Sequence, residues 1–580
     1  MRPYRRPGAP PADNDRLLGY GTTKPTTTAK MKRFALTALL LTPPSIGVNL
    51  AADVIVYGST PAGVLAAVAA AREGASVLLL DPRATPVGGM MSGGLGNTDL
   101  GTTTAVLGGL TRRFFEENCA HYYPDGPKPC FFANFEPSVA LDIFLGPAFL
   151  GNASTPVAVH TSTRFTGLTK DAATGRIVSG VTAAGDTVSA TSWVDATYEG
   201  ALLPLAGVST AFGREAVAQY NESVAGVLPE PHNASTPDHP FTSQGQLWEG
   251  LSPFFSNGSL IPLVTPPPGA VGSADDRLQA WNLRFTLTND TANMLQPWPR
   301  PASYDPAQME LLSRYIAARN ATAFTHTGLC CGATLPAAPG RPRTKFDVNS
   351  QRTDFQGLNW GYAQAVRAGD WAAQERILQA HRDLTLSYFY FLQNDARLPA
   401  SLRASMSDFG LPLDEHVACG HHLPCQVYVR EALRMVSDFV FTQADVEAAN
   451  TKADSVGMGA YTIDVMHGSL YAAADPAVGI LQEGGMQAPS FLPKTFAPFQ
   501  IPFRALTPRR AEATNLLVPV ALSASHVGFC AVRLEPTWTV LGESAGVAAA
   551  MAARAGVDVQ DVDVRALQAR LRALGQVLEL

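Results

Sequence analysis

The chain has 580 residues, of which 46% are hydrophobic and 16% charged, and its net charge is −6. This length exceeds what one ordinary core contains, so we expect either two domains or one elaborated domain. Lys and Arg form no long basic tract, and the weakly negative balance argues against a nucleic-acid partner.

The N-terminus divides into two unlike segments. Residues 1–30 are rich in Pro, Thr and Arg and are predicted to be a disordered tail. Residues 31–52 begin Met31-Lys-Arg, continue with an apolar run and break at two prolines, which is the layout of a secretory signal peptide. The apolar run is too short for a membrane span. Two alternatives remain: translation from Met31, or a disordered tail with a chance apolar segment.

Two further features favour the secretory pathway over a cytoplasmic location. Acceptors for N-glycosylation occur at Asn152, Asn221, Asn233, Asn257, Asn289 and Asn320. The seven cysteines include the close pairs Cys119/Cys130 and Cys419/Cys425 and the neighbours Cys330 and Cys331. Loop disulfides are the simplest interpretation, and without a Cys-x-x-Cys motif we expect no dithiol redox centre. The sequence thus predicts a secreted glycoprotein.

The strongest motif starts at Asp53-Val-Ile-Val-Tyr-Gly-Ser-Thr-Pro-Ala-Gly63 and continues through an alanine-rich helix to Val77-Leu-Leu-Leu-Asp81. It predicts the strand, glycine turn, helix and strand of a dinucleotide-binding βαβ unit. Gly58 permits the tight turn, and Gly63 permits close packing of the helix on the sheet. Asp81 ends the second strand, where a carboxylate can accept hydrogen bonds from a ribose. Thr60 replaces the middle glycine, so an ordinary βαβ turn is the alternative.

The middle of the chain changes character several times. A glycine-dense loop spans residues 88–96, a helical segment follows at 110–118, and β-strands with turns are predicted over 157–194. Residues 216–345 are rich in Pro, Asn, Ser and Thr. Helical spacing of apolar residues returns between 356 and 445, notably at 370–381 and 428–436. We interpret this inserted part as a substrate or cap domain.

The C-terminal part again shows the strand and helix pattern of the N-terminal βαβ unit. Asn515-Leu-Leu-Val-Pro-Val520 predicts a short buried strand, and the segment from Leu541 to Arg554 predicts a helix with small residues on one face. Gly542, Ala545 and Gly546 would let the start of that helix pack against a ligand or the first helix. The similar ends predict a discontinuous domain.

Together these segments resemble the FAD-dependent oxidoreductase family, within the glutathione-reductase-like flavoproteins. The resemblance runs from Asp53 to about Ala553 and rests on the order of these strings: Tyr57-Gly-Ser-Thr-Pro-Ala-Gly63, Gly88-Gly-Met90, Asp195-Ala-Thr-Tyr-Glu-Gly200, Gly213-Arg-Glu-Ala216, Trp281-Asn-Leu-Arg284, Ser523-Ala-Ser-His-Val527 and Arg533-Leu-Glu-Pro536. It implies an α/β fold with a Rossmann-like FAD-binding domain in two parts, 53–215 and 496–580, and an inserted α+β domain at 216–495.

The resemblance also implies which residues hold FAD. The amides of Gly58, Ser59, Thr60, Ala62 and Gly63 would bind the pyrophosphate. Asp81 and Arg83 would lie at the adenosine ribose, and Gly88, Gly89 and Met90 along the ribityl chain and flavin. The turn of Asp195, Ala196 and Thr197 would pass the pyrophosphate, and Glu535 would belong to the cofactor shell. Gly542, Ala545 and Gly546 would present a helix N-terminus to the flavin, whose reduced form carries negative charge. The 88–96 loop has no His or Cys for covalent attachment.

Candidates for catalysis and substrate binding are fewer. His526 is the first candidate for proton handling, with a core histidine as its alternative. Tyr198 is the second, with structural hydrogen bonding as its alternative, which applies equally to Glu199. Arg284, Asn349 and Arg430 are predicted to hold a polar or anionic substrate, and surface salt bridges are the alternative.

The Cys and His residues of 414–425 do not match a zinc pattern, so a Cys419–Cys425 disulfide is preferred and no metal is expected. No second nucleotide fingerprint occurs. We therefore expect an FAD-dependent oxidase or dehydrogenase that oxidises a small organic substrate, with oxygen or a quinone as electron acceptor. The alternatives are an NAD(P)-dependent Rossmann dehydrogenase and a carbohydrate-active or carbohydrate-binding protein with a vestigial nucleotide fold.

Overall fold

The computed structural model describes residues 47–228, 250–349 and 357–580, apart from 127, 129, 449, 467, 485 and 488–496. The predicted tail at 1–30, residues 31–46 of the predicted signal segment and the acceptor Asn233 lie outside the described residues. Residues 46–580 form one compact unit.

A seven-stranded sheet carries the fold, in the order β3-β2-β1-β6-β5-β4 with β20 also paired to β6. The strands β1, β2, β3, β6 and β20 pair in parallel, whereas β4, β5 and β6 form an antiparallel meander. Their bounds are β1 Asn49–Tyr57, β2 Val77–Leu80, β3 Ala158–His160, β4 Phe165–Lys170, β5 Ile177–Thr182, β6 Thr187–Asp195 and β20 Leu516–Leu517. The predicted βαβ unit and the predicted strands of 157–194 are confirmed.

The first strand begins earlier than the sequence suggested. Asn49 pairs with Thr187 and Ala52 with Ala190, so four residues assigned to the end of the signal segment lie in β1. The second half of β1 is fully buried, which explains why the apolar pattern could be recognised only from Asp53 onward.

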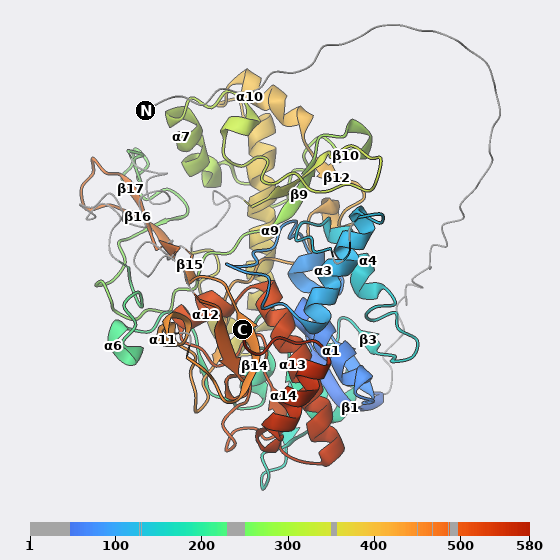
Figure 1. Ribbon diagram of the computed structural model, residues 1–580. Helices are drawn as coiled ribbons and strands as arrows, with labels where there is room; N and C mark the ends of the chain where they lie inside the picture. Colours follow the sequence, from blue (N-terminus) through green and yellow to red (C-terminus); the bar gives the residue numbers. More distant parts are fainter. Residues whose placement is uncertain are drawn as a thin grey trace, which may run out of the picture. The chain divides into compact units, whose positions relative to one another are not determined.

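Helix α1 (Pro61–Arg72) and helix α13 (Glu535–Ala555) pack against each other, although they come from opposite ends of the chain (Figure 1). A Cβ atom at Gly542 would overlap the carbonyl oxygen of Ala62, and one at Gly546 would overlap that of Ala66. Small side chains on both helices therefore bring the two backbones together. This packing confirms the predicted return of the C-terminal segment to the N-terminal unit.

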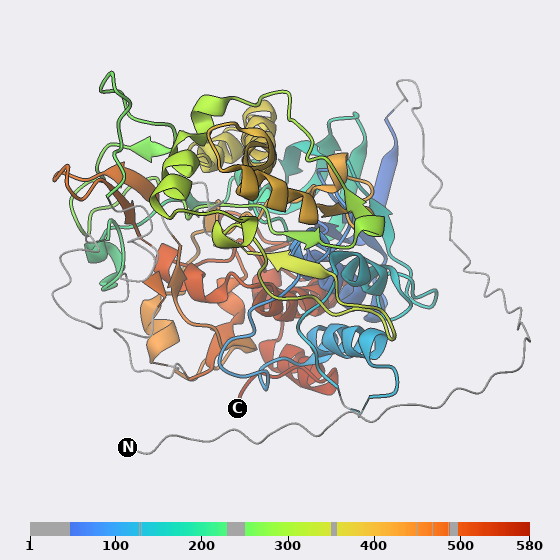
Figure 2. The same cartoon turned by 90° about the horizontal axis from the view of Figure 1, so that it is seen from above.

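Residues between these two parts form smaller sheets and additional helices. In Figures 1 and 2 the green and yellow elements of this region gather on one side of the blue and red elements. Two-stranded pairs include β9 (Phe285–Thr288) with β11 (Lys345–Val348), β10 (Met294–Leu295) with β12 (Leu411–Pro412), and β15 (Asp464–Val465) with β18 (Met486–Gln487). A three-stranded sheet contains β17 (Ile480–Glu483), β16 (Ser469–Ala472) and β8 (Val264–Thr265). The α-helices outside α1 and α13 are α2 Gly89–Ser92, α3 Gly109–Tyr122, α4 Pro137–Leu145, α5 Leu202–Leu205, α6 Val217–Tyr220, α7 Glu310–Ala318, α8 Tyr362–Arg367, α9 Trp371–Asn394, α10 Ala400–Ser405, α11 Gln443–Glu447, α12 His526–Val532 and α14 Val564–Ala573.

The helix predicted at 370–381 is confirmed as the first half of α9, capped by Asp370, whose side chain accepts a hydrogen bond from the amide of Ala373. The helix predicted at 428–436 is wrong. That segment is extended, and its strand β13 (Arg434–Met435) pairs with β7 (Thr210–Ala211). The apolar residues of this segment have helical spacing, but the segment is extended because Arg434 forms buried ion pairs with Glu215 and Glu431.

The inserted part does not end cleanly before the second part of the discontinuous domain. Strand β14 (Ser455–Gly459) pairs with β19 (Phe499–Pro502), across the expected boundary at 495. Ser544 of α13 donates a hydrogen bond to the carbonyl oxygen of Val456, at 2.6 Å. Helix α13, from the second part, thus packs on a strand assigned to the inserted part.

All three cysteine pairs are disulfides: Cys119–Cys130, Cys330–Cys331 and Cys419–Cys425. Cys530 is free and buried. In the described ranges no helix has the length and apolar character that crossing a membrane requires.

Candidate functional site

The predicted FAD-binding residues meet where β1, β2 and β6 reach their carboxyl ends. A small cavity of about 20 Å³ lies there. Its lining combines the glycine turn, the end of β2 and the turn after β6: Gly58, Thr60, Asp81, Pro82, Arg83, Thr85, Thr197, Tyr198, Glu199 and Gln426. The carboxyl ends of parallel strands are where ligands bind in open α/β sheets. The structure therefore brings together residues that the sequence assigned separately.

The glycine turn has a backbone geometry that glycine adopts readily. Gly58 has φ +101°, and a Cβ there would press on the backbone of residues 196 and 197. A Cβ at Gly63 would overlap the carbonyl oxygen of Gly58, so the start of α1 rests directly on the end of β1. Both glycines have the packing roles predicted for them.

Thr60 has a clear structural reason to replace the middle glycine of the fingerprint. Its hydroxyl accepts a hydrogen bond from the amide of Gly63 at 3.1 Å and donates one to the carbonyl oxygen of Ala196 at 2.7 Å. It is therefore the N-cap of α1 and a link to the turn after β6.

Asp81 organises the end of β2. One carboxylate oxygen accepts hydrogen bonds from the amide and the hydroxyl of Ser59, at 2.8 and 2.7 Å, and the other accepts one from the amide of Arg83 at 2.9 Å. Its place beside the glycine turn is the one expected for a ribose-binding acid.

Arg83 lines the same cavity, but its charge is paired with protein groups. Its guanidinium forms ion pairs with Glu199 and Glu375, each at 3.0 Å, and donates to the Tyr362 hydroxyl at 3.1 Å. It also lies 4.7 Å from the ring centre of Trp371. Sequence reasoning missed these partners, because Glu375, Tyr362 and Trp371 come from α8 and α9, far along the chain. Arg83 fastens these helices to the end of β2.

The turn after β6 is held by its own first residue. Asp195 is buried and accepts hydrogen bonds from the amide and hydroxyl of Thr197 and from the amide of Leu202. Burial raises the pKa of Asp195 to about 6, against the opposing effect of these hydrogen bonds. The amide of Ala196 donates a hydrogen bond to the carbonyl oxygen of Tyr57, so the pairing of β1 with β6 continues into the turn. The turn lies against the glycine turn, since a Cβ at Gly58 would press on residues 196 and 197, and its contact with the pyrophosphate stays a prediction.

The glycine loop meets the two remaining candidates, Tyr198 and Glu535. Gly88 and Gly89 both have positive φ, and a Cβ at Gly89 would collide with the hydroxyl of Tyr198. The amide of Met90 donates a 2.9 Å hydrogen bond to that hydroxyl, which in turn donates one of 2.5 Å to Oε1 of Glu535. The loop, the turn after β6 and the start of α13 therefore share one buried hydrogen-bonded chain.

Glu535 has the most unusual environment of these groups. It is the first residue of α13 and is 4% exposed. Burial raises its pKa to about 8, and the hydrogen bond from Tyr198 only partly opposes that rise. Its Oε2 atom is buried and has no hydrogen-bond partner among the described residues. At neutral pH this carboxyl therefore holds a proton beside the glycine loop.

The predicted role of Gly542, Ala545 and Gly546 at a helix start is wrong. Helix α13 begins at Glu535, two turns earlier, and the two glycines face α1. The small residues of this segment serve helix packing, which was the other function the sequence suggested for them. The N-terminus that can face a cofactor belongs to Glu535 and the residues directly after it.

His526 lies in a separate buried network. Its Nδ1 atom lies 3.0 Å from a carboxylate oxygen of Glu431, and its amide donates to Glu215 at 2.9 Å. Burial, assisted by the charge of Arg434, lowers the pKa of His526 to about 3, so its ring is neutral. Its Nε2 atom has no hydrogen-bond partner in the described part of the chain. These contacts connect His526 with buried acids, and its catalytic role stays a prediction.

The three predicted substrate residues differ in position. Arg284 is buried, forms a 2.7 Å ion pair with Asp347 and donates to the carbonyl oxygen of Asn97. Arg430 is also buried and donates to the carbonyl oxygen of Ala280. Asn349 is exposed, at the end of β11. The alternative of surface salt bridges is therefore wrong for both arginines.

The Cys and His residues of 414–425 have other partners. Cys419 and Cys425 are joined, and Nδ1 of His422 contacts the carbonyl oxygen of Glu415 at 3.0 Å. Within the described ranges, His, Cys, Asp and Glu side chains form no group of three arranged to hold a metal ion.

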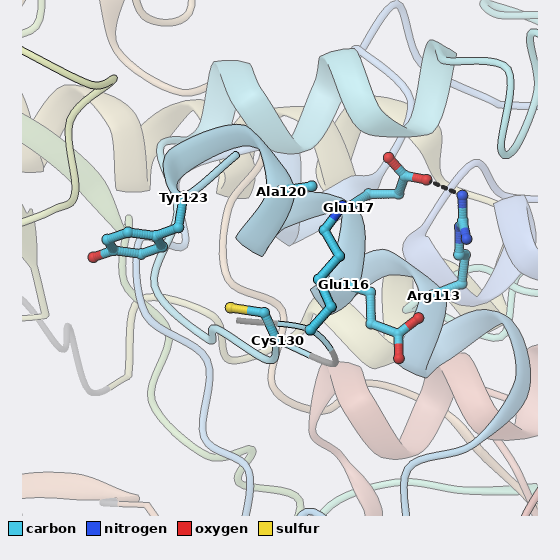
Figure 3. Close-up of a pocket in the computed structure, with 7 residues that line it drawn as sticks. Arg113, Glu116, Glu117, Ala120, Tyr123 and Cys130 are labelled. Atoms are coloured by element: carbon cyan, nitrogen blue, oxygen red, sulfur yellow. Dashed lines mark ion pairs between the residues drawn. The ribbon is translucent and has the colours of Figure 1, made fainter. Parts of the chain in front are cut away.

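Cavities larger than the strand-end cavity also occur among the described residues. One cavity, of about 540 Å³, is next to α3, where Arg113 pairs with Glu117 and the Cys119–Cys130 loop forms one wall (Figure 3). Its lining mixes both charges and contains none of the predicted site residues. A cavity of about 280 Å³ lies on the far side of Arg83, between the meander and α9, with Arg164 and Trp371 in its wall.

Comparisons with known proteins identify the family of the chain. A profile of the family described as FAD dependent oxidoreductase matches residues 53–571. Among curated protein sequences, no match to the chain is found. Similar solved structures include a 3-ketosteroid-delta4-(5alpha)-dehydrogenase from Rhodococcus jostii, with 17% identity over 27% of this chain and 49% of that one and a TM-score of 0.19.

Two further structures are similar at the same level. Thioredoxin reductase from T. acidophilum is 21% identical over 25% of this chain and 35% of that one, with a TM-score of 0.17. The OxyS anhydrotetracycline hydroxylase from Streptomyces rimosus is 17% identical over 31% of this chain and 41% of that one, with a TM-score of 0.22. The match spans less than half the length of each of these three proteins. The profile match extends over the first predicted part of the nucleotide-binding fold and over most of the second, as far as residue 571.

Proposed function

Because the chain belongs to the family of FAD-dependent oxidoreductases, we propose that it is an oxidase or dehydrogenase that oxidises a small organic substrate by hydride transfer to non-covalently bound FAD. One observation carries this proposal. Tyr198 and Glu535 form a buried hydrogen-bonded pair against the glycine loop, and Oε2 of Glu535 has no partner among the described residues. Such a pair can hold or release a proton where a substrate would meet the flavin.

The residues of the strand-end cavity fit FAD. The carboxylate of Asp81, the amides at the start of α1 and the glycine loop offer groups suited to the adenosine ribose, the pyrophosphate and the flavin end of FAD. A buried carboxyl oxygen without a partner is rare in folded proteins, and Oε2 of Glu535 therefore indicates a ligand group at this point. The loop at 88–96 contains no His or Cys, which supports non-covalent binding.

When bound, FAD supplies a two-electron acceptor for a hydride from a substrate carbon. Oxidation of an alcohol or amine to the carbonyl or imine also releases one proton from the oxygen or nitrogen. Ionised Glu535 can accept that proton, directly or through the Tyr198 hydroxyl. Since the pKa of Glu535 is about 8, this capacity grows as the pH rises toward 8. In the reverse direction the protonated carboxyl is the donor.

An absorbance spectrum of the purified protein tests the proposal, followed by anaerobic addition of candidate alcohols, amines and hydroxy acids. We expect bound flavin that is released intact by denaturation and that bleaches with a substrate. A colourless protein that cannot be reconstituted with FAD, or one that binds NAD(P) in its place, would refute the proposal. Flavin that remains in the precipitate after acid denaturation would contradict non-covalent binding alone.

For the cellular setting we propose the secretory pathway, with oxygen or a quinone as electron acceptor. Three disulfides support an oxidising environment. Four of the predicted glycan acceptors are exposed, namely Asn221, Asn257, Asn289 and Asn320, and Asn152 is half-buried. Treatment of the protein from its native source with N-glycosidase should lower its apparent mass. An unchanged mass, together with free thiols at Cys119 and Cys130, would contradict this location.

A further inference from the structure

Two guanidinium groups lie over the indole ring of Trp371, the first residue of α9. The guanidinium of Arg83 lies 4.7 Å from the ring centre and that of Arg164 lies 5.1 Å from it. Trp371 is half-buried and lines the cavity of about 280 Å³ between the meander and α9. We call this space the Trp371 cavity. Its lining contains no residue of the glycine loop.

The two arginines are held in different ways. Arg83 is fixed by the two ion pairs and the hydrogen bond described above. The Arg164 guanidinium is half-buried, and among the described residues it contacts the ring of Trp371 without a hydrogen bond or an ion pair. The Arg164 side chain can therefore shift by the thickness of one ring without breaking a polar contact, whereas that of Arg83 cannot.

The walls of the Trp371 cavity suit a flat, uncharged ring. Phe165, Leu205 and Val366 supply apolar surface. The side-chain amide of Gln374 donates a 3.3 Å hydrogen bond to the carbonyl oxygen of Ala365, which leaves its own oxygen to accept one from a ligand. The volume of about 280 Å³ is just below the range of about 300–1,000 Å³ that drug-sized ligands need. The cavity therefore suits one ring system rather than a whole dinucleotide.

The charged groups at this cavity balance one another. Its wall contains Arg83, Arg164 and Glu199, and Glu375 next to it is the second ion-pair partner of Arg83. Two guanidinium groups thus meet two carboxylates. The site therefore requires no net charge of its ligand, which favours a neutral ring over a phosphate or a carboxylate.

The Trp371 cavity adjoins the acid that is predicted to hold the ribose. Pro82, Arg83 and Glu199 line both this cavity and the strand-end cavity, to which Asp81 belongs. In adenosine the base is bonded directly to the ribose, so it must lie next to the group that binds the ribose. With a ribose at Asp81, the base would reach the Trp371 cavity along the Arg83–Glu199 ion pair.

We propose that the adenine ring of FAD occupies the Trp371 cavity and stacks between the indole of Trp371 and the guanidinium of Arg164. This inference rests on the proposed function and adds a contact between the inserted region and the cofactor. Bases of any kind stack on aromatic side chains and on guanidinium planes. The amino group of adenine would also find an acceptor in the Gln374 oxygen. Helix α9, assigned above to a substrate or cap domain, thus binds the cofactor as well.

A second cavity, of about 370 Å³, also borders Arg83 and Trp371. Its wall includes the charged side chains of Glu375 and Arg382, and Leu378 is the large aliphatic side chain beside them. This cavity shares no residue with the antiparallel meander that supplies Arg164. It therefore suits a flat, uncharged ring less well than the Trp371 cavity does, and it is the alternative position that the test must separate.

The first test compares ligands with and without adenine. FAD, ADP and FMN are titrated calorimetrically into the full chain after its flavin has been released. We expect Trp371→Ala to bind FAD and ADP about 10-fold or more weakly, because a stacked base contributes about that much, and to bind FMN as the wild type does. Trp371→Phe keeps a ring and should recover part of the loss. Unchanged affinity of Trp371→Ala for ADP, or equal weakening of all three ligands, would overturn the adenine assignment.

Trp360→Ala is the matched control. Trp360 is another half-buried tryptophan of the inserted region, and the Arg277 guanidinium lies 4.8 Å from its ring centre, but it lines neither cavity. We expect this variant to bind ADP as the wild type does. An equal loss of ADP affinity in Trp360→Ala and Trp371→Ala would mean that both substitutions loosen the inserted region, and it would contradict a contact specific to Trp371.

A second pair of variants separates the two cavities. Arg164→Ala removes the proposed cover of the base, so we expect several-fold weaker ADP binding. Gln379→Ala changes an exposed residue in the wall of the 370 Å³ cavity and should leave ADP binding unchanged. The opposite pattern would place the base in that cavity and overturn the assignment. In addition, ADP should quench the tryptophan fluorescence of the wild type more than that of Trp371→Phe, and equal quenching would contradict stacking on Trp371.

The two proposals can fail separately. If the wild-type chain neither contains FAD nor takes it up, the proposed function is refuted and the adenine assignment falls with it. If the wild-type chain binds FAD while Trp371→Ala retains full affinity for FAD and ADP, the proposed function stands and the assignment of the adenine ring is wrong.

Discussion

Tyr198 and Glu535 are joined by a 2.5 Å hydrogen bond although 337 positions separate them in the chain. Tyr198 follows the turn after β6, and Glu535 starts the helix that packs on α1. The bond therefore joins the first and second parts of the nucleotide-binding domain, which the inserted region separates in the sequence. Through the Tyr198 hydroxyl it also links a carboxyl with a pKa of about 8 to the amide of Met90.

Replacing Tyr198 by Phe should slow flavin reduction while flavin stays bound. The variant keeps the ring packed near Trp538 but removes the acceptor for the Met90 amide and the donor to Glu535. Loss of a positioned proton carrier typically costs about 100-fold or more in rate. Anaerobic stopped-flow measurement of flavin bleaching gives the rate. A wild-type rate at full flavin content would show that the pair only shapes the loop.

The stability of the protein should depend on the ionisation of Glu535. Its pKa is about 8 in the folded state and near 4.5 in an ordinary setting, so between these values the unfolded chain has released a proton that the folded chain retains. The free energy of unfolding therefore falls as the pH rises through this window, by up to ~1.4 kcal/mol per pH unit from this group.

Glu535→Gln is the corresponding test, because glutamine cannot ionise. Urea unfolding of variant and wild type at pH 5, 6, 7 and 8 gives the difference between their free energies. We expect that difference to shift in favour of the variant as the pH rises. A difference that does not change with pH would mean that Glu535 titrates in its ordinary range.

Acid should destabilise the protein through its buried histidines. Burial lowers the pKa of His381, His416 and His526 to about 3. Below pH 6.5 the unfolded chain binds protons on these rings and the folded chain does not, so the free energy of unfolding falls as the pH drops toward 3, by up to ~1.4 kcal/mol per pH unit for each. His381→Phe should reduce this dependence in unfolding curves from pH 6.5 to 4.5. The exposed His326→Phe is the control, and an equal effect of both would contradict the assignment.

A methyl group at Gly63 should disturb both stability and cofactor retention. In Gly63→Ala the new Cβ would overlap the carbonyl oxygen of Gly58 and push α1 away from β1. Overpacking of this kind costs about 1–3 kcal/mol. Gly167→Ala is the matched control, because a Cβ there meets nothing within 4 Å. The flavin content of both purified variants provides the measurement, and full retention in Gly63→Ala would refute the predicted cofactor contact at the start of α1.

Gly546→Ala separates helix packing from cofactor binding. Its Cβ would overlap the carbonyl oxygen of Ala66 in α1, so we expect a loss of about 1–3 kcal/mol in the free energy of unfolding. The flavin content of each folded molecule should stay the same, because the contact lies between two helices. Loss of flavin without loss of stability would restore the role at the cofactor that the sequence originally suggested.

Local patterns predicted much of the fold. The apolar strand, glycine turn and terminal acid of 53–81 formed as expected, because each part is determined by residues close in sequence. Spacing also suggested loop disulfides, Cys419–Cys425 among them, although it did not determine the connectivity of the seven cysteines. The helix expected at 428–436 failed, because the apolar spacing of this segment does not reveal that Arg434 and Glu431 are buried in an ion-paired network.

The sequence predicted which residues lie together at the strand ends, but not how their side chains pair. Gly58, Thr60, Asp81, Arg83 and Thr197 line one cavity, as the fingerprint indicated. In contrast, the ion pairs of Arg83 with Glu199 and Glu375 depend on a tertiary arrangement that leaves no local pattern. Arg533 did carry a signal, since it belongs to the Arg533-Leu-Glu-Pro536 motif, but its ion-pair partner Asp464 has none.

The contact between α1 and α13 also sets an order of events during synthesis on the ribosome. Helix α1 emerges early, yet the surface that covers it, as well as the strand β20 that borders β6, is translated more than 400 residues later. Until then the small apolar face of α1 has no native partner. The nascent chain must therefore keep this face shielded, by transient contacts or by a chaperone, until the last helices arrive. Truncations that end before residue 535 should accordingly accumulate as aggregates or chaperone complexes.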